Sequence, residues 1–222
     1  MYILRLAVFA SLRGRLRIIV VRHGQSEGNA NGVIQGRLDF GLSDLGWRQA
    51  EATAARLARE RVDRVIASPL RRAWDTATVI AGALGLVAEA RDELLEYDIG
   101  AISGLTGRQV RERFPGIVAA YQRGERPRFP GEEGREEFLL RVSALLRDHR
   151  DADETVVAVA HGGVVGALCY AALGLDYGRP GMFRVANCSV TEFARDRSGR
   201  VVLQRVNDTC HLGDLLSEND GG

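Results

Sequence analysis

Residues 17–24 read RIIVVRHG and residues 155–163 read TVVAVAHGG. Each stretch is a short apolar run rich in β-branched residues, which is typical of a parallel strand buried on both faces. Each run is followed directly by His-Gly, at His23 and at His161. Because ligand sites in open α/β sheets form at the carboxyl ends of the strands, we expect both histidines at one rim of the sheet.

The remainder of the chain alternates between strand-like and helix-like segments. Further strands are predicted at 62–67, 86–90 (the weakest), 189–194 and 200–206, the last two forming a hairpin. Helices are predicted from Asp44, at 68–84, at 110–121 with a break at 114–116, along the stripe 138–146, and at 163–173. This alternation predicts an α/β fold with three layers (α/β/α), a mostly parallel central sheet and helices on both faces.

Three sequence signals mark helix ends. Ser43 is a suitable N-cap for the helix beginning near Asp44. Ser68-Pro69 offers an N-cap followed by proline in the first turn of the next helix, and Gly174 can close the helix that follows His161.

Composition excludes several classes of protein. The chain has 222 residues, of which 45% are hydrophobic, so it can bury a sizeable core. Its 30 basic and 29 acidic residues leave a net charge of +1, which argues against nucleic acid as a partner. No apolar run approaches the roughly 18 residues of a membrane span, so no membrane partner is expected. All the basic residues are arginine, which excludes mechanisms that need a lysine.

The three cysteines are Cys169, Cys188 and Cys210, without a CxxC pair. An odd number argues against a disulfide framework and for a reducing compartment, so we expect a cytoplasmic location. Residues 1–16 do not have the order of a signal peptide, because Arg5 interrupts the apolar part. We interpret 1–16 as an N-terminal extension of unknown role, with a surface anchor as the alternative, and 214–222 as a flexible tail.

The residues that follow the strands favour phosphoryl transfer. They are Arg22 and His23, Ser68 to Arg72, Glu93 to Glu96, and His161. Arginine forks bind phosphate oxygens, a neutral histidine can attack phosphorus, and a carboxylic acid can protonate the leaving oxygen. The set predicts a phosphohistidine mechanism that needs no metal and no cofactor, because arginine and the second histidine carry the charge.

Local sequence leaves alternatives open at this point. It does not separate Arg72 from Arg71, or Glu96 from Glu93 and Asp98. A zinc hydrolase is the metal alternative, although His23 and His161 lack the HxH or HExxH spacing.

Three ordered motifs carry a resemblance to a known family. RHGQSEGN at 22–29, SPLRRAWDTA at 68–77 and VAHGG at 159–163 resemble the signature blocks of the histidine phosphatase superfamily. Further similarity extends over about 17–212. The resemblance implies a phosphoglycerate-mutase-like fold, with a single histidine phosphatase domain at 17–213 and a small helical cap insertion at about 100–150.

The resemblance also implies a role for each matching residue. His23 matches the nucleophile and Glu96 the proton donor, while the phosphate pocket and substrate contacts match Arg22, Arg72, His161, Asn29, Gln35, Gly36 and Gly162. The chain departs from the family pattern at Gly28, where a Trp is common, and at Ile102-Ser103, where Trp-Glu is common. We expect these changes to alter pocket shape more than chemistry.

The resemblance therefore implies a metal-independent phosphomonoester hydrolase acting on a small phosphorylated metabolite. A bisphosphoglycerate-dependent mutase is one alternative, weakened because 96–100 reads EYDIG and not the mutase pattern ERHYG. A non-catalytic phospho-ligand binding module is the other. Arg123, Arg126 and Arg128 either bind a second anionic group of the substrate or form a solvated loop. The oligomeric state stays open between monomer and homodimer.

Overall fold

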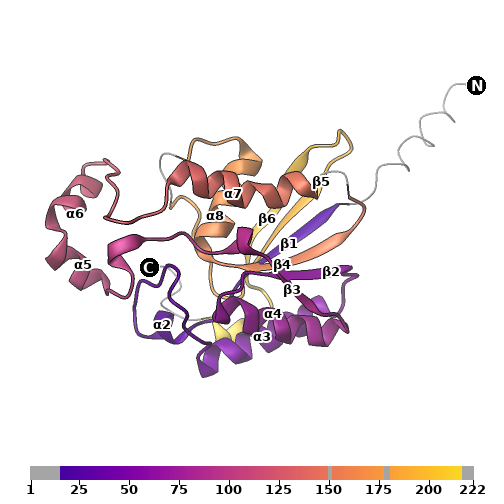
Figure 1. Ribbon diagram of the computed structural model, residues 1–222. Helices are drawn as coiled ribbons and strands as arrows, with labels where there is room; N and C mark the ends of the chain where they lie inside the picture. Colours follow the sequence, from indigo (N-terminus) through magenta and orange to yellow (C-terminus); the bar gives the residue numbers. More distant parts are fainter. Residues whose placement is uncertain (1–15, 150–151, 178–180, 217–222) are drawn as a thin grey trace, which may run out of the picture.

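A six-stranded sheet organises the computed structural model, which describes residues 16–149, 152–177 and 181–216 (Figure 1). The strand order is β3-β2-β4-β1-β5-β6. The strands are β1 (Arg17–Arg22), β2 (Arg64–Ala67), β3 (Ala88–Ala90), β4 (Thr155–Ala160), β5 (Val190–Arg195) and β6 (Val201–Asp208). β1 to β4 run parallel to one another, and β5 runs antiparallel to both of its neighbours, β1 and β6, which confirms the mostly parallel sheet.

The two runs that the sequence analysis singled out form the centre of this sheet. β1 pairs with β4 in parallel, in a register that places Val21 opposite Val159 and Arg22 opposite Ala160. Both strands are buried on both faces, because each has a neighbour on either side and helices above and below. The segments that follow the two strands therefore emerge side by side, although 138 positions separate His23 from His161.

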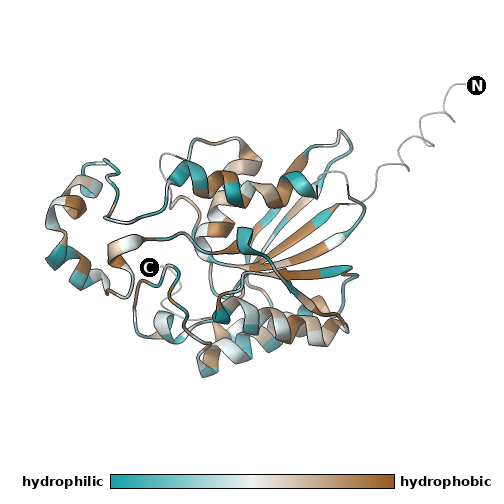
Figure 2. Ribbon diagram, viewed as in Figure 1, coloured by the Kyte–Doolittle hydropathy of each residue, from teal (hydrophilic) through white to brown (hydrophobic). Residues whose placement is uncertain are grey.

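Helices cover both faces of the sheet, as predicted (Figures 1 and 2). On one face, α7 (Arg135–Asp148) and α8 (Gly162–Leu173) pack against the side chains of Ile18 and Val20. On the other face, α3 (Asp44–Leu57) and α4 (Arg71–Leu84) pack against Ile19 and Val21. The period of two along β1 thus divides its side chains between two cores.

Two of the three helix-end predictions are confirmed. Ser43 caps α3, with its hydroxyl accepting from Gly46 N at 3.1 Å, and Gly174 closes α8 in the left-handed conformation. The Ser68-Pro69 prediction is wrong, because α4 begins at Arg71 after Leu70, which makes no side-chain cap. The Ser68 hydroxyl instead accepts from Leu70 N at 3.3 Å and bonds to His161.

A helical cap stands apart from the sheet (Figure 1). It contains α5 (Gly107–Arg113) and α6 (Pro115–Gln122), separated at Phe114 as the sequence predicts. Its buried residues form a cluster of their own around Ile102, Leu105 and Val110. The predicted insertion at about 100–150 also includes α7, but the buried side chains of α7 belong to the main core.

Four short helices complete the described chain: α2 (Glu27–Ala30), which the sequence analysis did not predict, and the 3-10 helices η1 (Asp92–Leu94), η2 (Gly100–Ile102) and η3 (Gly213–Leu215).

The predicted terminal segments lie mostly outside the described residues. Of the extension at 1–16, only Leu16 is described, and it is buried in the main core. Of the tail at 214–222, residues 214–216 are described, and Leu215 O accepts a hydrogen bond from Gln49 Nε2 at 2.8 Å. Among the described helices, none combines the length and the apolar character needed to cross a bilayer.

Candidate active site

The ends of β1 and β4 bring two histidines together. His23 follows β1 and His161 follows β4, and their ring centroids lie 5.1 Å apart. α4, which begins shortly after β2, brings Arg72 to the same rim, where its Nε lies 3.2 Å from His23 Nε2. The convergence that the sequence predicted for His23, His161 and Arg72 is therefore present.

His23 is held in a defined tautomer. Its Nδ1 lies 2.7 Å from Gly24 O, and a carbonyl oxygen can only accept, so Nδ1 carries the proton. Nε2 then carries the lone pair, and Arg72 Nε donates to it. Burial, with the charges of Arg72 and Arg22, holds the pKa of His23 well below its usual value. The ring is therefore neutral at pH 7, with a nucleophilic Nε2.

His161 is fully buried beside this ring. Its Nε2 lies 2.8 Å from Ser68 Oγ, whereas its Nδ1 has no hydrogen-bond partner among the described residues. Burial first, and then the Arg72 charge, hold the pKa of His161 well below its usual value. A buried ring nitrogen without a partner is costly, and a bound phosphoryl oxygen could supply one.

Arg72 is locked in place and remains charged. Its side chain is 1% exposed, and its Nη1 and Nη2 donate to Leu38 O at 2.7 Å and to Gly36 O at 2.8 Å. A guanidinium has five N–H donors, so donors remain for an anion. Burial lowers the pKa of Arg72 to about 10, which keeps the positive charge at neutral pH. Arg22 lines the same cavity, and its Nη1 donates to Val185 O.

Asn29 is oriented with its amide nitrogen free to donate. Its Oδ1 accepts from Ser26 N at 3.2 Å and from Asn187 Nδ2 at 3.4 Å, so the oxygen faces these donors. Asn187 Nδ2 also donates to His23 O at 2.9 Å and thereby holds the histidine backbone. The sequence analysis did not assign Asn187 to the site.

Gly28 is explained by the side chain of Gln35. A Cβ atom at position 28 would lie 2.6 Å from Gln35 Cδ, so Gln35 occupies the space that a larger residue at 28 would need. Gln35 Oε1 accepts from Ser26 Oγ at 2.8 Å, and both Gln35 and Gly36 line the cavity.

Glu96 reaches the start of α8. Its Oε2 accepts from Gly163 N at 3.1 Å and its Oε1 from Tyr97 N at 2.8 Å. A Cβ atom at Gly163 would lie 2.3 Å from Glu96 Oε1, so this close approach requires glycine. Of the three candidate carboxylates, Glu96 lines the cavity, whereas Asp98 Oδ1 accepts from Gly100 N at 3.0 Å.

We call residues 93–98, the segment around Glu96, the acid loop. Two arginines and one carboxylate hold its backbone in place. Arg37 Nε donates to Glu96 O at 3.1 Å, and Arg141 Nη1 donates to Leu95 O at 2.8 Å. The carboxylate of Glu133 accepts from Arg37 Nη2 at 3.0 Å and from Arg141 Nη2 at 3.1 Å. Glu133 therefore joins both arginines, which contact the acid loop from two sides.

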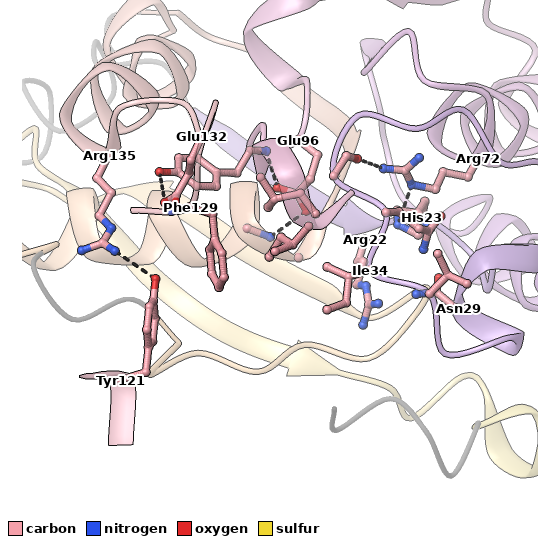
Figure 3. Close-up of a pocket in the computed structure, with 18 of the residues that line it drawn as sticks. Arg22, His23, Asn29, Ile34, Arg72, Glu96, Tyr121, Phe129, Glu132 and Arg135 are labelled. Carbon is pink, nitrogen blue, oxygen red and sulfur yellow. Dashed lines mark hydrogen bonds between the residues drawn. The ribbon is translucent and has the colours of Figure 1, made fainter. Parts of the chain in front are cut away.

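These residues surround one cavity of about 560 Å³ (Figure 3). It is lined by all the predicted site residues except the fully buried His161: Arg22, His23, Asn29, Gln35, Gly36, Arg72, Glu96 and Gly162. It is also lined by residues that the sequence analysis did not assign to the site: Val33, Ile34, Tyr97, Ile99, Ile102, Tyr121, Phe129, Glu132, Arg135, Gly163 and Tyr177. No local spacing signals Tyr121, Phe129 and Arg135, because the cap and α7 bring them into place. Gly163, in contrast, directly follows His161 and Gly162 in the sequence.

The side chains of Arg123, Arg126 and Arg128 do not line this cavity. Arg123 pairs with Glu125, and Arg126 donates to the backbone and lies over the ring of Tyr121. Arg128 lines a neighbouring hollow. The exposed Arg71 pairs with Asp75, which agrees with the selection of Arg72.

Comparison with known proteins places these motifs in context. The family model of the histidine phosphatase superfamily (branch 1) matches residues 18–209. Phosphoserine phosphatase 1 of Hydrogenobacter thermophilus is 34% identical over 206 residues, which cover 91% of this chain and 97% of that protein.

Two solved structures share the fold. A mycobacterial glucosyl-3-phosphoglycerate phosphatase in complex with VO3 matches with a TM-score of 0.75 and 31% identity, over 87% of this chain and 99% of that one. The phosphoserine phosphatase of Entamoeba histolytica in complex with 3-phosphoglyceric acid has a TM-score of 0.78 and 27% identity, over 89% and 99%.

Proposed function

The chain belongs to the histidine phosphatase superfamily and is a phosphomonoesterase, and on that premise we propose that it acts through a phosphohistidine on His23. The observation that carries this proposal is the hydrogen bond from His23 Nδ1 to Gly24 O. It leaves the lone pair on Nε2, beside the Arg72 guanidinium. The relatives are named for phosphoserine and glucosyl-3-phosphoglycerate, so the proposed substrates are small phosphorylated metabolites of this size class.

Phosphate binding uses the charged end of the cavity. The guanidinium groups of Arg22 and Arg72 and the amide nitrogen of Asn29 surround the phosphoryl oxygens, and His161 Nδ1 gains the partner that it otherwise lacks. Gly162 lies at the N-terminus of α8, where backbone N–H groups favour an anion. These groups supply the positive charge that the transferring phosphoryl group requires, so the proposed reaction needs no metal.

The proposed reaction has two steps. His23 Nε2 attacks phosphorus, the N–P bond forms as the ester P–O bond breaks, and the acid Glu96 gives its proton to the departing alkoxide. Water then attacks the phosphohistidine and gives a proton to Glu96. The N–P bond breaks, and phosphate leaves with His23 neutral again.

Trapping the intermediate tests this proposal. Protein quenched during turnover of a ³²P-labelled phosphomonoester should carry an acid-labile, base-stable label on His23. His23→Ala should lose both the label and turnover, whereas His149→Ala, whose side chain pairs with Glu154 outside the cavity, should keep both. Turnover that survives in His23→Ala would contradict the mechanism.

One set of assays tests both the substrate class and the choice between a phosphatase and a mutase. We expect hydrolysis of members of a panel of phosphorylated metabolites assayed in EDTA. We expect release of phosphate from 3-phosphoglycerate, whether or not 2,3-bisphosphoglycerate is added. Isomerisation that depends on the bisphosphate would favour the mutase, and tight binding without turnover would favour the binding module.

Location and assembly are separate proposals. Cys169, Cys188 and Cys210 all lie in the described part of the chain and form no disulfide with one another, which supports a cytoplasmic location. A homodimer is proposed as well, and light scattering of the wild type tests it.

A further inference from the structure

The phosphate-binding groups occupy only one end of the cavity (Figure 3). The cavity volume of about 560 Å³ lies in the range of sites that hold complete metabolites. The proposed phosphate-binding groups come from β1, α2, α4 and the start of α8, whereas the other end is built by the cap, the start of α7 and the segment after α8. We call this other end the distal subsite and define it by Tyr121, Phe129, Arg135 and Tyr177.

The walls of the distal subsite are aromatic. Tyr121 and Phe129 are stacked, with ring centroids 6.0 Å apart and planes 27° apart. Phe129 also packs edge-on against Phe114, at 5.4 Å between centroids, so the cap core supports its ring. Such a surface binds an apolar or ring-shaped body and offers few hydrogen bonds to a chain of hydroxyl groups.

Two guanidinium groups lie beside Tyr121: that of Arg126 lies 5.0 Å from the ring centroid, and that of Arg135 lines the cavity. Arg135 Nη2 donates to Tyr121 OH at 3.2 Å, and Arg135 forms no ion pair with any residue in the described part of the chain. The nearby carboxylate of Glu132 has other partners, because its Oε1 accepts from Tyr97 OH at 2.6 Å and its Oε2 from Phe129 N at 2.7 Å. The guanidinium of Arg135 therefore has donors available in the cavity wall.

The position of Arg135 on its helix strengthens this point. Arg135 is the first residue of α7, where the helix dipole favours negative charge over positive charge. A guanidinium at this position therefore breaks a local preference. Glu136 and Glu137 already supply negative charge in the first turn of α7, so a bound anion would interact with the guanidinium of Arg135.

Resting on the proposed function, we propose that the distal subsite binds the leaving group of the substrate and that Arg135 recognises a carboxylate on it. The preferred substrates are then phosphomonoesters with an apolar or ring-shaped body that ends in a carboxylate. Arg135 contacts the body of the leaving group away from phosphorus, so its contribution is to binding, and it is a specificity-determining residue of this site.

Three matched aryl phosphates test the proposal. Phenyl phosphates with a para propyl, carboxymethyl or carboxyethyl group share the phosphate and the ring, and two of them carry the carboxylate at different lengths. The wild type should have a KM about tenfold or more lower for at least one acid than for the propyl compound, with similar kcat, because a charge-assisted bidentate contact is gained. Arg135→Ala should remove this preference and leave the propyl compound unchanged, and Arg135→Lys should retain part of it.

Arg123→Ala is the matched control, because it removes an exposed arginine of the same cap that pairs with Glu125. It should keep the full preference. A wild type that prefers neither acid, or a preference that survives in Arg135→Ala, would overturn the inference while leaving the proposed function intact. Absence of turnover with all three esters in the wild type would instead overturn the proposed function, and the inference with it.

Discussion

At the scale of single residues, the carbonyl of Gly24 selects which nitrogen of His23 can react. A histidine at the same place without that acceptor could protonate Nε2 and lose its nucleophile. Glycine at position 24 is required for a separate reason, because a Cβ atom there would lie 2.5 Å from Gly46 O. The segment that supplies the acceptor is therefore fixed by its packing against the start of α3.

The two buried histidines make stability depend on pH. In the folded protein the pKa values of His23 and His161 lie well below 6.5, whereas in the unfolded chain both return to about that value. Their contribution to stability is therefore complete above about pH 7 and is lost as the pH falls through 6.5, because the unfolded chain then binds more protons. Urea unfolding at pH 7.5, 6.5 and 5.5 should show this fall. His161→Gln should show a shallower fall, and an unchanged slope would contradict the assignment.

A methyl group added at Gly163 should separate proton donation by Glu96 from the attack of His23 on phosphorus. Gly163→Ala places a Cβ atom 2.3 Å from Glu96 Oε1 and should displace the carboxylate. We expect kcat to fall about a hundredfold with an alkyl phosphate, whose alkoxide needs a proton, and far less with 4-nitrophenyl phosphate. Gly166→Ala is the control on the same helix, because no atom lies within 4 Å of its added Cβ. Equal losses with both esters would argue against the acid role of Glu96.

At the scale of elements, the acid loop depends on residues from two other segments. Arg37 follows α2 and Arg141 lies on α7, and both donate to carbonyl groups of the loop. Glu133 contacts both guanidinium groups and also accepts from Asp98 N at 3.1 Å through its Oε2. The placement of Glu96 therefore depends on how α7 docks.

Neutralising Glu133 should loosen this arrangement. Glu133→Gln keeps the shape but removes the charge that holds both arginines, so Glu96 should be positioned less well. We expect a fall of about tenfold in kcat for alkyl phosphates, with KM and 4-nitrophenyl phosphate turnover nearly unchanged. Glu136→Gln, which changes an exposed residue of α7 three positions further along the chain, should behave as the wild type. A loss in Glu133→Gln that is the same for both esters would point to a general structural role.

At the scale of the whole molecule, the sheet separates two hydrophobic cores, and each core contains a different pair of helices. Leu145 on α7 is 2% exposed within the core of one face, whereas Leu140 on the same helix is 64% exposed. Leu145→Ala should lower the free energy of unfolding by about 2–5 kcal/mol, because it leaves a cavity. Leu140→Ala should change it by less than about 0.5 kcal/mol. Urea unfolding measures both, and equal effects would contradict this packing.

Sequence alone predicted the parts whose signals are local. The runs before His23 and His161 are strands because β-branched residues suit a sheet that is buried on both faces. The site residues come directly after these strands in the sequence. Ser68 was misassigned as a cap because its hydroxyl bonds to Leu70 N and to His161, which is distant in sequence. Tyr121, Phe129 and Arg135 were missed because their meeting depends on how the cap folds over the sheet.

The pairing of β1 with β4 has a consequence for synthesis on the ribosome. The nucleophile is translated 138 positions before the histidine that follows its neighbouring strand, Thr155–Ala160. Until that strand is made, the β-branched run Arg17–Arg22 lacks this partner and is exposed to wrong associations. Recovery of turnover after denaturation therefore reports completion of the entire sheet, which makes activity a sensitive assay of refolding.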